Sequence, residues 1–288
     1  MIVCPRCSLH HASLDASCPA CGFAPASLNG FPAWAPEMAN EGGGFHESFF
    51  AELAQREAGN FWFEARNAII VRTLKRFFPQ LQSFLEIGCG TGFVLSGIAR
   101  AFPEVRLVGT EIFVAGLPFA AARVPSASFA QMDARRLPYA AEFDVVGAFD
   151  VIEHIEEDVD VLENLKHAVK LGGGVVISVP QHKWLWSDID KQSFHFRRYE
   201  MRELHEKIEG VGLEIVYSTS FVSLLLPLMF LSRRRKSESL EFDAGREFRI
   251  GSAVNASLRT VMGIERLILG TGLTLPVGGS RLVVAKRR

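Results

Sequence analysis

The stretch FLEIGCGTGFVLSGIA, residues 84–99, decides the fold. An apolar run typical of a buried strand passes through Gly88, Gly90 and Gly92 into a run with helical spacing of its apolar residues. Glycines between a strand and a helix allow a ligand to approach the backbone closely. The stretch therefore predicts a ligand-binding turn at the carboxyl end of a strand.

Strands and helices alternate on the carboxyl side of this turn. We expect strands at 83–88, 105–110, 127–132, 143–149 and 174–179, a closing pair at 213–221 and 280–287, and helices at 92–101, 113–123 and 158–170. Short apolar strands that alternate with helices favour a mostly parallel sheet covered on both faces. The predicted fold class is α/β and Rossmann-like.

The chain divides into three predicted parts. Residues 1–24 form a cysteine-rich unit, and residues 25–44, rich in Pro, Gly and Asn, are expected to be a linker. Residues 45–288 form the α/β domain, in which 222–279 is an insertion that acts as a lid or faces a membrane.

Composition and charge exclude some classes of protein. The 288 residues carry a net charge of −1, which gives no general attraction to nucleic acid. We find no run of 18 apolar residues and no basic-then-apolar signal peptide, so we expect neither a membrane-spanning helix nor export. The expected location is a reducing cytoplasm.

Four of the five cysteines lie in two CxxC pairs near the N-terminus. Cys4 and Cys7 form the first pair, and Cys18 and Cys21 form the second. Zinc prefers four tetrahedral thiolates, and two such turns supply two ligands each. Disulfides are the alternative, disfavoured without an export signal. We predict a structural Zn²⁺ ion, because a site closed by four thiolates leaves no position for a substrate.

The glycine turn does not match either common phosphate-binding motif. A dinucleotide fingerprint needs glycine where Phe93 stands, and a P-loop needs a lysine that the turn lacks. Glu111 follows the second strand, where a carboxylate can accept both ribose hydroxyls. Asp133 follows the third strand, where a carboxylate can accept an adenine amino group. The ligand predicted by these residues is a nucleoside without a pyrophosphate.

The motifs LEIGCGTG, VGTEIF, QMDARRLP and FDVVGAFDVIEHI resemble, in this order, the class I S-adenosylmethionine-dependent methyltransferases. The resemblance covers roughly residues 60–220 and the last strand. It implies a seven-stranded, mostly parallel sheet with an antiparallel last strand, and S-adenosylmethionine as cofactor. The cofactor-binding residues that it implies are Gly88, Gly90 and Gly92 for the methionine part, Glu111 for the ribose, Asp133 with the backbone of Met132 and Ala134 for the adenine, Asp150 beside the sulfonium, and Glu86 behind the loop or at the amino group.

Two histidines are candidate catalytic bases. His154 lies in DVIEHIEED, and His195 lies in SFHFRRYE, after the fifth strand. A base is needed only when the acceptor is protonated, because the sulfonium is already an activated leaving group. Asp150 is also able to cap a helix. As a further alternative, Asp150, Glu153 and His154 could together bind Mg²⁺ or Zn²⁺.

The loop after the fifth strand also carries Arg198 and Tyr199. We expect this pair to anchor the loop rather than to contact substrate. Residues 221–236, FVSLLLPLMFLSRRRK, place an apolar run before four basic residues. This pattern fits a buried cap over the sheet or, alternatively, peripheral contact with the inner face of a membrane.

The predicted function is methyl transfer to a small-molecule or lipid-linked acceptor, with oxygen as the expected acceptor atom. One alternative is an RNA or protein methyltransferase that uses the zinc unit as a clamp. Nucleic acid is disfavoured because Arg6 is the sole cation in residues 1–24. Another alternative is a non-catalytic, cofactor-binding scaffold. An NAD-dependent oxidoreductase is disfavoured by Phe93.

Overall fold

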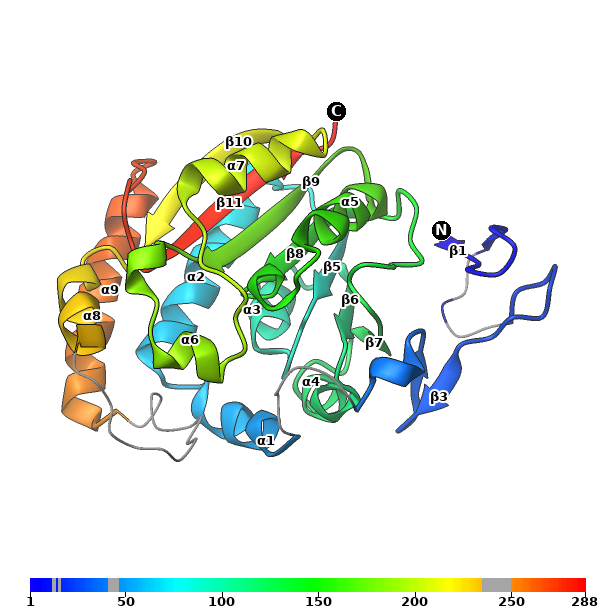
Figure 1. Ribbon diagram of the computed structural model, residues 1–288, viewed down its shortest axis with the longest axis horizontal. Helices are drawn as coiled ribbons and strands as arrows, with labels where there is room; N and C mark the ends of the chain where they lie inside the picture. The colour runs from blue at the N-terminus through cyan, green and yellow to red at the C-terminus, as the bar shows by residue number, and fades with distance from the viewer. Residues whose placement is uncertain (12–13, 15–16, 41–46, 235–249) are drawn as a thin grey trace.

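The computed structural model describes residues 1–11, 14, 17–40, 47–234 and 250–288 (Figure 1). One large sheet runs in the order β10-β11-β9-β8-β5-β6-β7-β4-β3. Its strands are β3 (Ala26–Leu28), β4 (Phe31–Ala33), β5 (Ser83–Ile87), β6 (Arg106–Glu111), β7 (Ser128–Gln131), β8 (Phe143–Phe149), β9 (Val169–Pro180), β10 (Glu214–Phe221) and β11 (Ser280–Lys286).

The seven strands from β7 to β10 form the predicted methyltransferase-type sheet. The pairs β5–β6, β5–β8, β6–β7 and β8–β9 are parallel, and β11 is antiparallel to both β9 and β10. The prediction of a mostly parallel sheet with an antiparallel last strand is confirmed. Because parallel strands end at the same edge, the residues that follow β5, β6, β7 and β8 meet there.

Each central strand is apolar on both faces because helices cover both sides of the sheet. Phe84 and Val145 belong to one core cluster, whereas their neighbours Leu85 and Val146 belong to the other. Every residue of β5 is buried. This accounts for the continuous apolar runs in the sequence, which alternating half-exposed strands would not show.

Two layers of helices enclose the sheet (Figure 1). The first cluster includes residues of α2, α3, α4 and α9, and the second includes residues of α5 and α7. Their bounds are α2 (Phe61–Phe77), α3 (Phe93–Ala101), α4 (Leu117–Arg123), α5 (Asp158–Ala168), α7 (Met201–Gly210) and α9 (Ser252–Gly270). The insertion thus contributes α9 to a core-covering layer, packed beside α2.

Two helices precede the first strand of the parallel sheet. Helix α1 (Glu47–Arg56) ends before Gly59, which adopts φ +85°, and α2 begins after Asn60. The Asn60 side chain accepts a hydrogen bond from the Trp62 N–H at 2.9 Å and caps α2. This break turns α1 away from α2.

The segment predicted as a linker, 25–44, is structured over its described part. Strands β3 and β4 form a hairpin, and Ala33 of β4 pairs in parallel with Gln131 of β7. The buried Gln131 amide bonds both backbone groups of Ala35, at 3.1 and 2.7 Å, just before the short helix η1 (Pro36–Met38). The sheet therefore extends into a segment for which the sequence predicted a linker without secondary structure. The buried Gln131 amide makes this possible because it satisfies both backbone hydrogen-bonding groups of Ala35.

The N-terminal unit docks on the α/β domain. Strands β1 (Ile2–Val3) and β2 (His10–His11) form a separate two-stranded sheet. The Val3 N–H donates to the carbonyl of Pro138 at 2.8 Å, and Ile2 is buried in the same core cluster as Tyr139. In Figure 1 the unit lies beside the body of the molecule, beyond β7.

The described part of the insertion contains α8 (Leu226–Arg234) and α9. The fully buried Glu265 of α9 accepts hydrogen bonds from the N–H groups of 222–224 at 2.6–2.8 Å, which ties α9 to the segment before α8. Residues 235–249, including two of the four predicted basic residues, lie outside the described part. Among the described helices, none is long and apolar enough to cross a bilayer.

Candidate functional site

The turn after β5 has a conformation that favours glycine. Gly88, Gly90 and Gly92 have φ angles of +61°, +52° and +74°. A Cβ atom on Gly88 would lie 2.5 Å from Val151 Cγ2, whereas a Cβ on Gly90 would meet no atom within 4 Å. The turn is thus closely packed below and open at Gly90, where a ligand can lie against the backbone.

Glu111, at the end of β6, lies beside this turn. Its carboxylate accepts the N–H of Gly90 at 2.9 Å through one oxygen. The other oxygen accepts the N–H groups of Ile112 and Phe113, at 2.9 and 3.2 Å. Burial raises the pKa of Glu111 although these three donors oppose the shift. The structure brings together the turn and the acid that the sequence singled out for a ribose.

Glu86 of β5 lies shortly before the turn, and its side chain is buried. Its Oε2 atom has no hydrogen-bond partner among the described residues, and burial raises its pKa well above the usual value while the charge of Arg66 opposes that shift. A buried acceptor without a partner is costly. An amino group of a ligand bound over Gly90 would satisfy it, so the residues fit S-adenosylmethionine on chemical grounds.

The carboxylate of Asp133 is occupied by a residue that the sequence analysis did not consider. Arg135 donates to both oxygens at 3.0–3.1 Å through Nε, and its backbone N–H adds a bond of 2.9 Å. The Met132 N–H is used by the carbonyl of Glu111 at 3.1 Å. Contact between adenine and Asp133 therefore requires Arg135 to share or release the carboxylate, and Ala134 remains as the partly exposed backbone position.

Asp150 follows β8 in a left-handed conformation, with φ +57°. Its side chain pairs with Arg66 of α2. The Arg66 guanidinium lies 4.5 Å from the centre of the Trp62 ring. Sequence reasoning missed Arg66, because its partner is far along the chain and no local motif links them.

A second unpredicted contact ties the residue directly after α1 to the glycine turn. Thr91 Oγ1 donates to the buried carboxylate of Glu57 at 2.5 Å. Arg123 of α4 bonds the same carboxylate at 2.5 Å and the Thr91 carbonyl at 3.0 Å. The glycine turn is therefore supported from both flanking helices.

The two predicted bases meet beyond the end of β8. His154 ends the short helix η3 (Ile152–His154), and His195 follows α6 (Asp188–Gln192). Their ring centres lie 4.6 Å apart, nearly perpendicular at 84°. Burial, together with the charge of His195, lowers the pKa of His154 to about 3. His154 is therefore a weak base at neutral pH, and His195, with Nδ1 3.0 Å from Oδ1 of Asp190, is the better candidate.

The segment around His195 is anchored as predicted. Arg198 Nε donates to Asp190 at 2.6 Å, and the Tyr199 hydroxyl donates to Asp158 at 2.6 Å. Arg233 of α8 also reaches Asp190, at 3.0 Å. Of the basic residues that the sequence analysis singled out in 221–236, Arg233 is thus bound within the protein.

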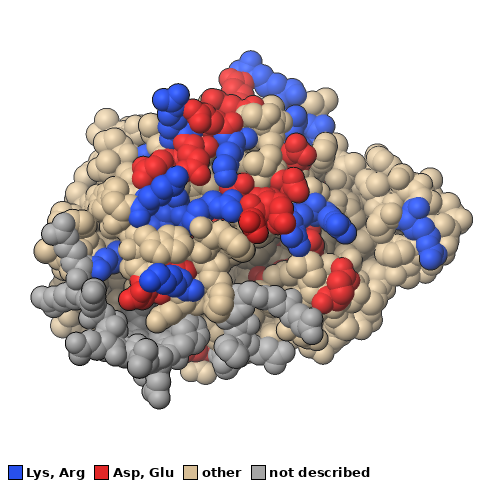
Figure 2. All heavy atoms as spheres, viewed as in Figure 1, with Lys and Arg blue, Asp and Glu red and all other residues tan. Residues whose placement is uncertain are grey.

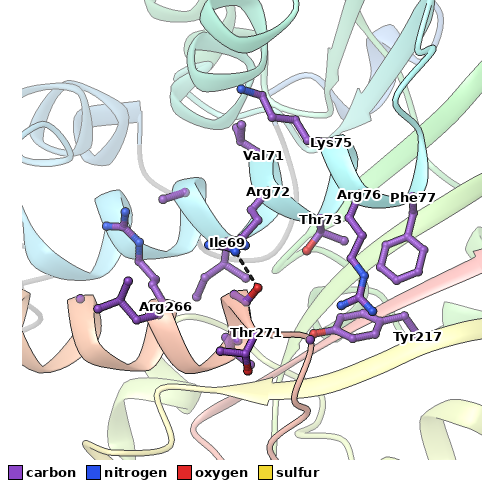
Figure 3. A pocket seen from close by; sticks show the side chains of 16 residues that line it. Ile69, Val71, Arg72, Thr73, Lys75, Arg76, Phe77, Tyr217, Arg266 and Thr271 are labelled. Carbon is purple, nitrogen blue, oxygen red and sulfur yellow. Dashed lines mark hydrogen bonds between the residues drawn. The ribbon is translucent and has the colours of Figure 1, made fainter.

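Away from the strand ends, an open groove of about 790 Å³ lies between α2 and α9 (Figure 3). Four basic side chains line it: Arg72, Lys75, Arg76 and Arg266. Among the described residues, no acidic side chain does so. Arg72 is fixed by the carbonyl of Gly270 at 2.7 Å. The groove is suited to an anion and is separate from the glycine turn.

On the face seen in Figure 2, acidic and basic side chains interleave over the body, while the N-terminal unit is largely uncharged. Helix α7 shows the mixture, with Arg202 paired to Glu206 at 2.7 Å. A mixed surface gives no extended basic stripe on this face for a phosphate backbone.

The four N-terminal cysteine sulfurs converge. The Sγ atoms of Cys4 and Cys21 are 3.6 Å apart, as are those of Cys7 and Cys18, and all four lie within 4.8 Å of one another. Thiolates at about 2.3 Å from a tetrahedral zinc ion stand about 3.8 Å apart. The cluster therefore has the size that a zinc site requires.

Comparison with known proteins bears on the same region. Residues 85–175 match the family described as "Methyltransferase domain". A "Probable S-adenosylmethionine-dependent methyltransferase" of Mycolicibacterium smegmatis is 27% identical over 162 residues, which cover 54% of this chain and 60% of that protein. The trans-aconitate 2-methyltransferase of Methylobacterium radiotolerans is 28% identical over 98 residues, 34% of this chain and 38% of that protein.

Among solved structures, phosphoethanolamine N-methyltransferase 2 of Haemonchus contortus, in complex with S-adenosyl-L-methionine, has the same fold. The TM-score is 0.56 at 18% identity, over 84% of this chain and 57% of that one. The chain thus matches less than two thirds of the length of these relatives.

Proposed function

We propose that this chain is a class I S-adenosylmethionine-dependent methyltransferase that transfers a methyl group to a small-molecule or lipid-linked acceptor, at oxygen. The match of residues 85–175 to the methyltransferase-domain family and the likeness to an S-adenosylmethionine-dependent relative support this proposal. The observation that carries the proposal is the open face of Gly90 beside the buried carboxylate of Glu111. The geometry suits a nucleoside ligand that lies against the backbone without phosphate contacts.

The residues divide the work of binding. Gly88–Gly92 would receive the methionine part, Glu86 its amino group, and Glu111 the ribose. Asp150, held by Arg66, stands at the end of β8 between this region and the histidines. When bound, S-adenosylmethionine supplies an electrophilic methyl group on a sulfonium. The protein then chiefly positions the acceptor and excludes water, which is worth about 7–11 kcal/mol in favourable cases.

Oxygen is proposed as the acceptor atom for two reasons. His195, oriented by the buried Asp190, can take a proton from a hydroxyl. One relative is named for trans-aconitate, an organic acid whose nucleophilic heteroatoms are oxygens. Trp184, 52% exposed and stacked on His182 near this segment, offers a flat apolar surface for the rest of the acceptor.

A thermal-shift titration with S-adenosylhomocysteine, run beside NAD⁺, tests the cofactor. Ligand at 100 times its dissociation constant stabilises a protein by about 2.7 kcal/mol, enough to raise the melting temperature by several degrees. We expect a shift with S-adenosylhomocysteine alone. A shift with NAD⁺ alone, or with neither ligand, would reject the proposal.

We further propose that Cys4, Cys7, Cys18 and Cys21 bind one structural Zn²⁺ ion. The short strands of the N-terminal unit bury little apolar surface, so the ion would supply much of its folding energy. Metal analysis of the purified chain should find this zinc, and Cys4→Ser should lose it. A fully folded wild-type protein without zinc at these cysteines would refute the assignment.

Peripheral membrane contact is proposed for 221–236. Helix α8 leaves Leu228 and Leu231 more than half exposed, at 55% and 61%. Flotation with anionic vesicles should carry the protein in low salt, and Leu228→Ser with Leu231→Ser should abolish it. Equal flotation of the variant would reject α8 as the contact.

A further inference from the structure

Three ionisable side chains beyond β8 point their ligand atoms at one another. Glu153, His154 and His195 each offer one donor atom, and these atoms all lie within 4.8 Å of one another. Glu153 is fully buried, and neither of its carboxylate oxygens has a hydrogen-bond partner among the described residues. A buried carboxylate left without partners is strongly unfavourable unless a proton or a cation compensates for it.

Each imidazole also has a partner outside the cluster. Nδ1 of His195 lies 3.0 Å from Oδ1 of Asp190, whose carboxylate is fixed by Arg198 at 2.6 Å. The His154 ring hydrogen-bonds the backbone at Ser193. Metal-binding histidines are oriented in this way, with one nitrogen bonded to a carboxylate or a carbonyl and the other left for the ion. The arrangement is therefore more specific than a chance cluster of titratable groups.

We propose that Glu153, His154 and His195 bind one divalent transition-metal ion through a carboxylate oxygen and two imidazole nitrogens. Two imidazoles favour Zn²⁺, Fe²⁺, Co²⁺ or Ni²⁺ over Mg²⁺ or Ca²⁺, which prefer oxygen ligands. Three protein ligands leave coordination positions open, as in catalytic metal sites. Both histidines are partly exposed, so solvent or substrate can reach those positions.

This ligand set differs from the metal alternative considered from the sequence. Asp150 is paired with Arg66 and belongs to the cofactor side. His195 takes its place, brought in by the segment after β9. The N–H of Phe196 donates to the Glu153 carbonyl at 2.8 Å, which fixes the two parts of the site against each other.

The role of the ion rests on the proposed function. An acceptor hydroxyl bound to the metal would lose its proton to solvent more readily, because the cation stabilises the alkoxide. The oxygen then attacks the methyl carbon, the carbon–sulfur bond breaks, and S-adenosylhomocysteine leaves with the electron pair on sulfur. While it holds the ion, His195 does not act as the base. In this scheme the metal replaces it in activating the hydroxyl, and the oxygen acceptor of the proposed function is kept.

Metal counting tests the binding itself. The full chain and its variants are dialysed to equilibrium against micromolar Zn²⁺, and bound zinc is measured by mass spectrometry. We expect Glu153→Gln, which mimics the uncharged acid, to bind about one ion fewer per chain than wild type. His195→Gln should show the same loss, and Glu156→Gln, an exposed acid on the same segment, should show none. The difference in zinc content between wild type and a variant reports on this site alone, whether or not the four cysteines hold a zinc ion of their own.

Equal zinc content in wild type, Glu153→Gln and His195→Gln would overturn the proposal. Melting curves identify a variant that has not folded, and agreement of the two substitutions guards against that artefact. Titration with S-adenosylhomocysteine separates the two claims. A wild-type chain that binds the extra ion but not S-adenosylhomocysteine would keep the metal site and reject the proposed function, and the reverse result would reject the site alone.

Discussion

Glu111→Gln is the substitution that tests the cofactor site most directly. In the free protein the carboxylate accepts three backbone N–H groups, with Gly90 on one oxygen and Ile112 and Phe113 on the other. A glutamine in the same place keeps one accepting oxygen but turns an NH₂ group toward a donor. One backbone N–H is then left unsatisfied, and we expect the free protein to lose about 1–3 kcal/mol of stability.

The effect on binding follows from the same geometry. A carboxylate can accept from both ribose hydroxyls, whereas the amide offers one acceptor. Loss of a hydrogen bond to a charged group costs about 1.5–3 kcal/mol, which is about a 10- to 150-fold rise in the dissociation constant. Glu111→Ala removes both acceptors and should weaken binding further.

Isothermal titration with S-adenosylhomocysteine measures this change, at a temperature where circular dichroism shows both proteins folded. Glu104→Gln is the matched control, since Glu104 is an exposed acid in the turn that precedes the opposite end of β6. A dissociation constant for Glu111→Gln within about threefold of wild type would refute the reasoning, because it would mean that neither hydroxyl depends on the charged oxygen.

Three further predictions, made with four substitutions, test the surroundings. Gly88→Ala should lose more stability in urea than Gly90→Ala: both incur about 1–2 kcal/mol of left-handed strain, but the Cβ at Gly88 also meets Val151, and equal losses would contradict the packing argument. Thr91→Val should lose about 1.5–3 kcal/mol, because it removes a bond to a buried carboxylate, and an unchanged urea midpoint would show that the α1 tether is dispensable. For Asp158, burial acts to raise the pKa, but Lys207 and Tyr199 hold it below the usual value. Its stabilisation is thus present above its unfolded pKa, about 3.9, and is lost as the pH falls through the folded value. Asp158→Asn should therefore lower the melting temperature at pH 7 and flatten its decline toward pH 3, whereas parallel pH profiles would exclude this ion pair as a source of acid sensitivity.

The sheet was predictable because its central strands are buried on both faces. Each strand appears in the sequence as a short apolar run, and the helices between the strands show the helical spacing of apolar residues. The hairpin of β3 and β4 was not predictable in this way. Its strands have three residues each, and its attachment depends on the side chain of Gln131, almost a hundred residues later. Within 25–44 itself the clearest local signal is its content of Pro, Gly and Asn, which is typical of a linker.

The meeting of the glycine turn and Glu111 was predictable for a related reason. Parallel strands place their carboxyl ends together, so Gly90 and Glu111 had to meet once the strands were assigned. Arg66 and Glu57 were missed because they reach Asp150 and the glycine turn from the segment that precedes β5, with no motif to connect them. The Gly59–Asn60 pair was a usable signal, since a helix break there directs α1 toward the strand ends.

The insertion illustrates how a sequence pattern can indicate the wrong partner for a residue. Arg233 belongs to a basic run that suggests lipid, yet its side chain is 10% exposed and donates to Asp190 and to Ser187 Oγ. Asp190 in turn orients His195, so α8 supports the acceptor side of the site from behind. Neutralising Arg233 would therefore disturb the histidine as well as any membrane contact, and a loss of flotation in such a variant could not be assigned to lipid. The exposed leucines of α8 lack this second role. They allow the membrane proposal and the metal proposal to fail independently of each other.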